Sequence, residues 1–230
     1  ISAMEHHSNI VPWQMIAEQR KFTLKYVPIT KEGALVGNWE EYITERTKMV
    51  SITHVSNSLG TVNPIENIVR KAHEVGAKVL IDGAQSLQHF KVDVQQLDID
   101  FFAFSGHKIF GPTGTGVLYG KKELLEKMPP YQGGGDMIKE VTLEKTTYNE
   151  LPHKFEAGTP HIAGIIGLGA AFDFLNRTDL QAVAQHEKEL LEHATNLIQR
   201  IEGVNIIGQS QNKVSVLSFL VDGTHPYDVG

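Results

Sequence analysis

The sequence contains no cysteine among its 230 residues. This absence excludes a disulfide framework, a thiolate metal site and a cysteine nucleophile within the chain. A substantial core is still expected, because a chain of this length buries roughly 70 to 75% of the surface that its unfolded form exposes and needs no covalent staple. A hydrophobic content of 41% and a charged content of 21% are those of an ordinary folded protein.

The chain also lacks a basic face and a long apolar run. Its formal net charge is -6 and its lysines and arginines form no cluster, which argues against a nucleic acid partner. The longest apolar runs, such as AGIIGLGAAF at 163–172, fall short of the roughly 20 residues that cross a bilayer, and no signal segment opens the chain. We therefore expect a cytoplasmic protein with no membrane partner. Because the chain begins without methionine and stops just after a strand-like run, we also expect a fragment lacking both ends.

Short apolar runs alternate with helical stretches along the first part of the chain. The runs are rich in β-branched and aromatic residues, and they predict buried strands at 24–29, 48–55, 77–83, 100–105 and 116–120. The stretches between them predict helices at 38–46, 64–76 and 121–128. This alternation predicts an α/β fold with a mostly parallel sheet that is covered on both faces.

The pattern changes after residue 163. Two long helices are predicted at 163–176 and 179–203, and strand-like runs follow at 204–208 and 214–223. The second helix has apolar residues at helical spacing with charges between them, which is typical of a helix packed on one face. A second, smaller α/β domain is therefore expected to begin near residue 180.

Polar residues gather where three of the predicted strands end. Taken singly, each has an ordinary interpretation as a turn, a solvated side chain or a structural histidine. Because the ligand site of an open parallel sheet lies outside the carboxyl ends of its strands, their joint placement predicts a functional site instead. These residues are Asn57, Asp82, Gln85, Ser105, His107 and Lys108.

The segment SGHKIFGPTGTG at 105–116 places Lys108 directly after an apolar run. Lysine is rarely buried without a partner, so its amine needs a specific role. A lysine with a lowered pKa forms a Schiff base with an aldehyde, and pyridoxal phosphate is the common biological aldehyde for this purpose. A buried carboxylate such as Asp82 would keep the pyridine nitrogen protonated. Ser105, His107 and the glycine-rich loop would supply phosphate donors, and Gln85 would reach the ring hydroxyl.

Other motif interpretations fit less well. The segment GPTGTG lacks the G-K-[ST] of a P-loop, and it leads into a strand instead of opening a helix, unlike a dinucleotide-binding fingerprint. The run EHH at residues 5–7 lacks the spacing of a metal-binding helix, so we expect no metal site. His6 is better explained as an aromatic ring that stacks on a planar cofactor.

Five segments together resemble a known family. They are EHHSNIVPWQ, THVSNSLGTVNP, VLIDGAQS, FSGHKIFGPTGTGVLYG and FEAGTPHIAGIIGLGAA, and they occur in the same order as in the class V aminotransferases. Within that family, the chain is most similar to the group II cysteine desulfurases of the SufS type. The resemblance implies pyridoxal phosphate fold type I, with the central part of a mostly parallel, seven-stranded-type large domain at 1–175. A connecting helix and the beginning of a small α/β domain would follow at 176–230.

The resemblance also implies roles around the cofactor ring. Lys108 would be the lysine that binds pyridoxal phosphate covalently, and Asp82 would pair with its pyridinium nitrogen. Gln85 would bind the ring hydroxyl, and His6 would stack on the ring. Lys108 and His6 are therefore the expected catalytic residues.

Further roles concern the phosphate, the substrate and the partner subunit. Ser105 and His107 would hold the phosphate, and Asn57 would lie beside the substrate carboxylate. In this family the threonine that matches Thr159 reaches the phosphate of the neighbouring subunit, which implies a homodimer.

The implied activity is that of a pyridoxal-phosphate-dependent cysteine desulfurase. Such an enzyme converts L-cysteine to L-alanine and passes the sulfur to an enzyme cysteine, and from there to an acceptor scaffold protein for iron–sulfur cluster assembly. The persulfide-forming cysteine, the substrate-binding arginines and an upstream threonine pair of the family have no counterpart in these 230 residues. Three alternatives stay open at this point: a selenocysteine lyase acting on L-selenocysteine, another class V aminotransferase or lyase, and a catalytically incomplete fragment.

Overall fold

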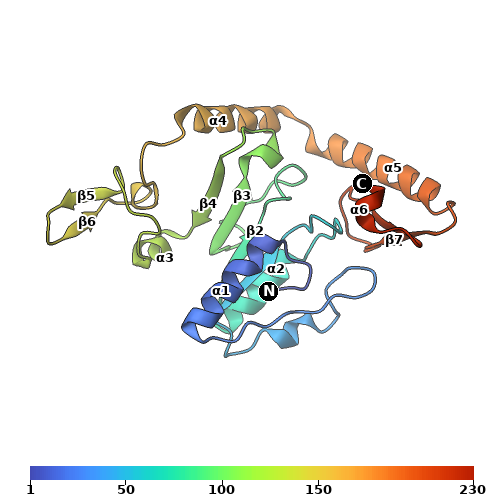
Figure 1. Cartoon of the computed structure of the whole chain (residues 1–230), viewed down its shortest axis with the longest axis horizontal. Coiled ribbons are helices and arrows are strands. Elements are labelled where there is room, and N and C mark those ends of the chain that lie inside the picture. The colour runs from blue at the N-terminus through green and yellow to red at the C-terminus, as the bar shows by residue number, and fades with distance from the viewer.

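The structure is a computed structural model that describes residues 1–230. A four-stranded sheet with the order β1-β2-β3-β4 lies at its centre (Figure 1). Its strands are β1 (Met49–Thr53), β2 (Lys78–Asp82), β3 (Phe101–Ser105) and β4 (Gly116–Gly120). β1, β2 and β3 are parallel, and β4 runs antiparallel to β3. The predicted α/β fold with a mostly parallel sheet is confirmed.

Two elements predicted from the sequence do not form as expected. The run 24–29 is not a strand, because Val27 and Ile29 make only isolated bridges, to Ser2 and Leu35. Pro28 lies between them and has no N–H to continue a ladder. The helix predicted at 38–46 is only a short 3-10 helix, η2 (Trp39–Tyr42).

One face of the sheet carries the main core. Helix α2 (Ile65–Glu74) forms where the sequence predicts it and buries Ile65, Ile68, Val69 and Ala72. These positions recur at helical spacing and make one apolar face. The helix packs against β2, whose Val79 and Ile81 are fully buried.

The opposite face is covered from the start of the chain. The 3-10 helix η1 (His7–Asn9) packs against β1 and leads into α1 (Val11–Arg20), which the sequence analysis did not predict. Pro12 in its first turn is a helix-start signal that could have indicated it. Val79 and Ile81 of β2 face α2. Because side chains alternate along a strand, the half-buried residues Leu80 and Asp82 lie on the other face.

Helix α4 (Ile162–Arg177) crosses the top of the sheet in Figure 1. Its Leu168 and Leu175 form a second, smaller core with Ile109 of η3 (Gly106–Ile109). Between β4 and α4 lie α3 (Lys122–Lys127), η4 (His153–Phe155) and a hairpin of β5 (Ile138–Val141) and β6 (Thr146–Tyr148). The hairpin, which was not predicted, projects away from the sheet at the left of Figure 1.

The last part of the chain forms a separate small layer beside the sheet. Its elements are α5 (Leu180–Ile198), the antiparallel pair β7 (Val204–Ile207) and β8 (Ser218–Val221), and α6 (Pro226–Val229). Backbone hydrogen bonds from Val62 to Asn212 (3.0 Å) and from Val214 to Gly60 (2.9 Å) tie it to the loop after β1. The boundary expected at 175/176 falls in the last turns of α4. None of the helices has the length and apolar character needed to span a membrane.

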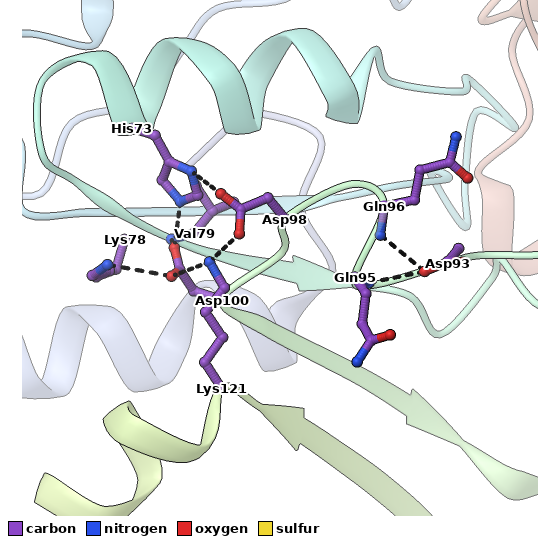
Figure 2. Close-up of polar contacts among 9 residues, drawn as sticks. All are labelled: His73, Lys78, Val79, Asp93, Gln95, Gln96, Asp98, Asp100 and Lys121. Atoms are coloured by element: carbon purple, nitrogen blue, oxygen red, sulfur yellow. Dashed lines mark hydrogen bonds and ion pairs between the residues drawn. The ribbon is translucent and has the colours of Figure 1, made fainter.

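An ion-pair network closes the amino ends of the strands (Figure 2). The fully buried Asp100, just before β3, accepts hydrogen bonds from His73 Nε2 (2.7 Å) and from Val79 N (2.9 Å). Lys121 Nζ lies 3.2 Å from Asp100 Oδ1 and 2.5 Å from Asp98 Oδ1. The network therefore joins α2, β2, β3 and the end of β4 at the edge of the sheet opposite to the predicted site.

Replacing Asp100 with alanine should destabilise the fold strongly. Removing one partner of a buried ion pair costs about 3 to 5 kcal/mol, and Val79 N would also lose its acceptor. The matched control is Asp98→Ala, because Asp98 shares His73 and Lys121 but its side chain is 65% exposed, and exposed pairs contribute about 0 to 1 kcal/mol. Urea unfolding of both variants measures the difference, and equal losses would contradict this assignment.

The contribution of Asp100 to the free energy of unfolding should depend on pH. Burial acts to raise the pKa of Asp100, but hydrogen bonds from His73, Val79 and Lys121 hold it below its ordinary value. A carboxyl whose pKa is lower in the folded protein stabilises the fold above its unfolded pKa of about 4, and this stabilisation is lost as the pH falls through the folded-state pKa. The gap in the free energy of unfolding between the parent and Asp100→Ala should therefore narrow in acid.

Candidate active site

The turn after β2 carries two of the predicted site residues. Asp82 ends the strand, and its Oδ1 accepts a hydrogen bond of 2.9 Å from Ala84 N. Gly83 N donates to Ala103 O at 2.7 Å, which fastens the turn to β3. A side chain at Gly83 is excluded, because a Cβ there would lie 2.0 Å from the ring of Phe102. The sequence GAQ after Asp82 therefore allows the turn to lie close against the neighbouring strand.

A cavity of about 340 Å³ opens at the carboxyl ends of β2 and β3. Asp82 and Ser105 lie on its wall beside Ala103, and Asn9 and Trp13 close it from the other side. This volume is within the range of about 300 to 1,000 Å³ that is typical of small-molecule and cofactor sites. A larger hollow of about 540 Å³ is lined only by residues 91–97 of one loop and brings no other element to it.

A buried network holds the segment that carries His6. Glu5 accepts hydrogen bonds from Ser2 Oγ and from Asn9 Nδ2, the latter at 2.7 Å. Asn9 Oδ1 in turn accepts from Trp13 Nε1 at 2.9 Å and from Ser51 Oγ of β1 at 2.6 Å. Burial raises the pKa of Glu5, and the hydrogen bonds from Ser2 and Asn9 oppose that rise. The network therefore fixes α1 and the residues before it to the sheet beside the cavity.

Lys108 lies in η3, three residues after Ser105 on the cavity wall. Its side chain is half-buried, and its Nζ makes no hydrogen bond or ion pair within the chain. The turn around it is tight, because a Cβ at Gly106 would lie 2.1 Å from Thr115 Oγ1. The amine is thus held on a short, well-packed element without a partner of its own.

The other predicted site residues do not line the cavity. His6 is exposed, and its Nδ1 accepts from Ser8 N at 3.2 Å, next to the cavity-lining Ser8 side chain. Gln85 is half-buried in the turn after Asp82, and His107 is exposed. Asn57, in the loop after β1, and Thr159, before α4, are also exposed. The structure thus brings Asp82 and Ser105 onto one wall and does not place the remaining six on the cavity lining.

Sequence analysis missed a buried histidine at this edge of the sheet. His54 follows β1 directly, and its Nδ1 lies 3.0 Å from Ser86 Oγ. Burial lowers the pKa of His54 to about 4, so the ring is neutral at pH 7. Trp13 and Asn9 were also missed as lining residues, although both belong to the segment EHHSNIVPWQ. The signal for His54 in the sequence was its own position, as an ionisable residue near the end of the predicted buried strand KMVSITHV.

The residues present fit pyridoxal phosphate. The cavity wall supplies the carboxylate of Asp82 for a cationic ring nitrogen and the hydroxyl of Ser105 for a phosphate oxygen. Lys108 supplies an amine without a partner in the chain, two residues beyond the glycine that follows Ser105. Asp82 is an acceptor, Ser105 is a hydroxyl donor and Lys108 is a free amine, and they lie in two segments at the carboxyl ends of neighbouring strands. Pyridoxal phosphate requires groups of these three kinds.

Comparison with known proteins gives consistent matches over the whole chain. The pattern described as "Aminotransferase class-V" matches residues 1–230. A probable cysteine desulfurase of Halalkalibacterium halodurans is 52% identical over 230 residues, which are 100% of this chain and 56% of the relative. The crystal structure of the cysteine desulfurase CsdA (S-sulfonic acid) from Escherichia coli is 41% identical and superimposes with a TM-score of 0.92, covering 99% of this chain and 57% of that one.

A more distant structure carries the cofactor itself. A lysine-to-alanine mutant of C-DES, with glycine covalently linked to its pyridoxal phosphate cofactor, is 25% identical and has a TM-score of 0.82. The match covers 99% of this chain and 62% of that structure's chain. The chain therefore spans little more than half the length of these three proteins, and only 34 to 38% of the length of three longer cysteine desulfurase relatives.

Proposed function

Because the chain belongs to the class-V aminotransferase family, we propose that it is the cofactor-binding part of a pyridoxal-phosphate-dependent cysteine desulfurase. The observation that carries this proposal is the cavity at the carboxyl ends of β2 and β3, with Asp82 and Ser105 on its wall and Lys108 on the next element. The identity of about half of all residues to a probable cysteine desulfurase supports the choice of reaction.

Four residues would act on the cofactor ring. Pyridoxal phosphate, when bound, supplies an aldehyde for amines and an electron sink for bonds at the α-carbon of an amino acid. Asp82 would keep a proton on the pyridine nitrogen by pairing with that cation, and Gln85 would orient the ring through its hydroxyl. His6 would lie over the ring, and Lys108 would hold the cofactor covalently and move a proton at Nζ.

The remaining predicted residues would act on the phosphate and the substrate. Ser105 and His107 would donate to the phosphate, together with backbone N–H groups of the glycine-rich loop. Asn57 would lie beside the substrate carboxylate, and Thr159 would reach the phosphate of a partner subunit. Both Asn57 and Thr159 are exposed, as residues that meet a substrate or a second chain must be before binding.

We also propose the wider setting of the complete protein. It would be a homodimer of the SufS type in the cytoplasm, with the first 175 residues in the large domain and the rest in the small one. L-cysteine would be its substrate, and an acceptor scaffold protein would take the sulfur for iron–sulfur cluster assembly. The test is to incubate the complete polypeptide with pyridoxal phosphate and L-cysteine and to follow alanine and protein persulfide together. Absence of both products would contradict the proposed reaction.

Removing the charge of Asp82 should weaken cofactor binding. Breaking a buried ion pair costs about 3 to 5 kcal/mol, and because Asp82 is half-buried we expect a smaller loss, with the dissociation constant of pyridoxal phosphate rising about tenfold to a hundredfold. Turnover should fall as well. The measurement is an absorbance titration of the complete Asp82→Ala variant.

Two further variants test the cause of that loss. Asp82→Asn retains an acceptor for Ala84 N but carries no charge, so it should bind the cofactor as weakly as Asp82→Ala. Asp93→Asn alters a similar turn, in which Asp93 Oδ1 accepts from Gln95 N and Gln96 N, away from the cavity, and should bind like the parent. Normal binding by Asp82→Asn would show that the carboxylate charge is not what holds the cofactor.

A further inference from the structure

The turn that carries Asp82 and Gln85 is held at both of its ends by one residue, His54, which directly follows the neighbouring strand β1. The backbone N–H of His54 donates to Asp82 O at 2.9 Å, at the beginning of the turn. Its ring Nδ1 lies 3.0 Å from Ser86 Oγ, at the end of the turn. His54 therefore contacts the turn at both of its ends.

His54 is itself fixed. Its carbonyl oxygen accepts from Asn63 N at 2.8 Å, and Asn63 Nδ2 donates to Thr53 O at 2.8 Å. Its ring centroid lies 5.5 Å from that of Phe90, which follows the turn. The side chain therefore has little freedom, and a contact that it makes with the turn is transmitted to a stationary part of the sheet.

The partner of the His54 ring is equally constrained. Ser86 is 0% exposed and His54 is 8% exposed, so their contact lies inside the protein. Ser86 N also donates to Gly83 O at 2.9 Å, which closes the turn on itself. Fixing the Ser86 hydroxyl therefore fixes the whole loop of chain from Asp82 to Ser86.

The choice of histidine at this position has a cost that packing alone does not explain. Burying an imidazole is less favourable than burying a phenyl ring of similar shape, because its polar nitrogens lose water. Burial lowers the pKa of His54 to about 4, so the ring offers a neutral hydrogen bond and no cation that would compete for Asp82. Residues that lower stability in this way concentrate at functional sites.

We propose that His54 is a positioning residue that acts through Ser86 to hold Asp82 and Gln85 in the geometry that the cofactor ring requires. This inference rests on the proposed function, because it assigns the turn a role toward pyridoxal phosphate. His54 does not line the cavity, so its effect is indirect. Sites that lose the support behind a contacting residue lose affinity even when every contacting residue remains.

The experiment compares variants of the complete polypeptide. His54→Phe retains a ring but removes the bond to Ser86, and Ser86→Ala removes the same bond from the other side. His54→Asn is the conservative variant, because its amide reaches the position of Nδ1 and can replace that bond. Thr61→Val is the matched control, since it deletes another buried hydrogen bond after β1, from Thr61 Oγ1 to Gly33 O (2.7 Å), without touching the turn.

Two readouts are measured for each variant. The first is the dissociation constant of pyridoxal phosphate, which should rise about tenfold in His54→Phe and in Ser86→Ala, and by no more in the double variant, because both remove one interaction. The second is hydrogen exchange of the apo protein, in which the amides of Ala84 and Ser86 should exchange about tenfold faster. His54→Asn and Thr61→Val should resemble the parent in both.

The outcomes separate this inference from the proposed function. If the parent binds pyridoxal phosphate but His54→Phe and Ser86→Ala bind it equally well with unchanged exchange, the positioning role is wrong and the proposed function stands. If His54→Asn is impaired as severely as His54→Phe, the bond to Ser86 is not the cause and the inference is overturned. If the parent itself fails to bind pyridoxal phosphate, the proposed function fails. Should His54→Phe not fold, Ser86→Ala decides the question alone.

Discussion

Replacing Lys108 with alanine in the complete polypeptide should lower turnover of L-cysteine by at least about a thousandfold. Loss of a covalent catalytic group has effects of this size, because the remaining residues can bind the reactants but cannot supply the missing amine. Lys108→Arg should be equally impaired, since a guanidinium keeps the charge but does not condense with an aldehyde. Lys122→Ala, at a side chain that is 80% exposed, is the matched control and should turn over like the parent.

Borohydride reduction provides an independent measurement. Reduction of the parent with bound pyridoxal phosphate should fix the cofactor on a single peptide that contains Lys108, and no label should remain in Lys108→Ala. Recovery of the label on another lysine would overturn the assignment, whatever the activity of the variants.

The structure gives reasons why other lysines are poorer choices. Lys121 Nζ is paired with Asp98 and Asp100, and although burial acts to lower its pKa, these partners raise it, so the amine stays protonated. Burial lowers the pKa of Lys213, but its Nζ donates to Gly208 O at 2.6 Å, in the small layer away from the cavity. Lys108 combines a half-buried position with an amine that has no partner.

Local patterns in the sequence predicted much of the sheet. The runs that became β1, β2, β3 and β4 are short and rich in β-branched and aromatic residues, and their length favours strands over helices. The prediction that all of them are buried is wrong for β4, an edge strand in which Val117 and Leu118 are exposed. The antiparallel direction of β4 could not be predicted, because the residues GVLYG make the same side-chain pattern in either direction. The failed strand at 24–29 shows that an apolar run needs a neighbour with a matching ladder as well as suitable side chains.

The site was predictable only where a strand end and a polar residue coincide. Asp82 and Ser105 were found in this way, and both line the cavity. Asn9 and Trp13 were not, because they act through contacts with residues far away in the sequence, such as the 2.6 Å bond from Ser51 to Asn9. His54 was missed for a related reason: its meaning depends on Ser86, 32 positions later in the chain.

A protein made of these 230 residues alone should form no persulfide from L-cysteine, even if it binds pyridoxal phosphate. Sulfur transfer requires a thiolate that attacks the substrate sulfur, so that a sulfur–sulfur bond forms as the carbon–sulfur bond breaks. The electron pair stays on the carbon, which takes up a proton to give alanine. The sequence has no cysteine, and no hydroxyl or amine matches a thiolate as a nucleophile at neutral pH.

The measurement is to incubate this protein with pyridoxal phosphate, L-cysteine and a reductant that is not a thiol, and to compare sulfide and alanine with a cofactor-only blank. The complete polypeptide is the positive control, and intact mass must show that the tested protein ends at Gly230. Under the proposed function, slow exchange of the substrate α-proton would survive, because that reaction would use Lys108 and Asp82 but no thiolate. Alanine and sulfide formed over many turnovers above the blank would show instead that sulfur leaves this site without a cysteine of the protein as its acceptor. The proposal that a cysteine elsewhere in the complete polypeptide accepts the sulfur would then be wrong.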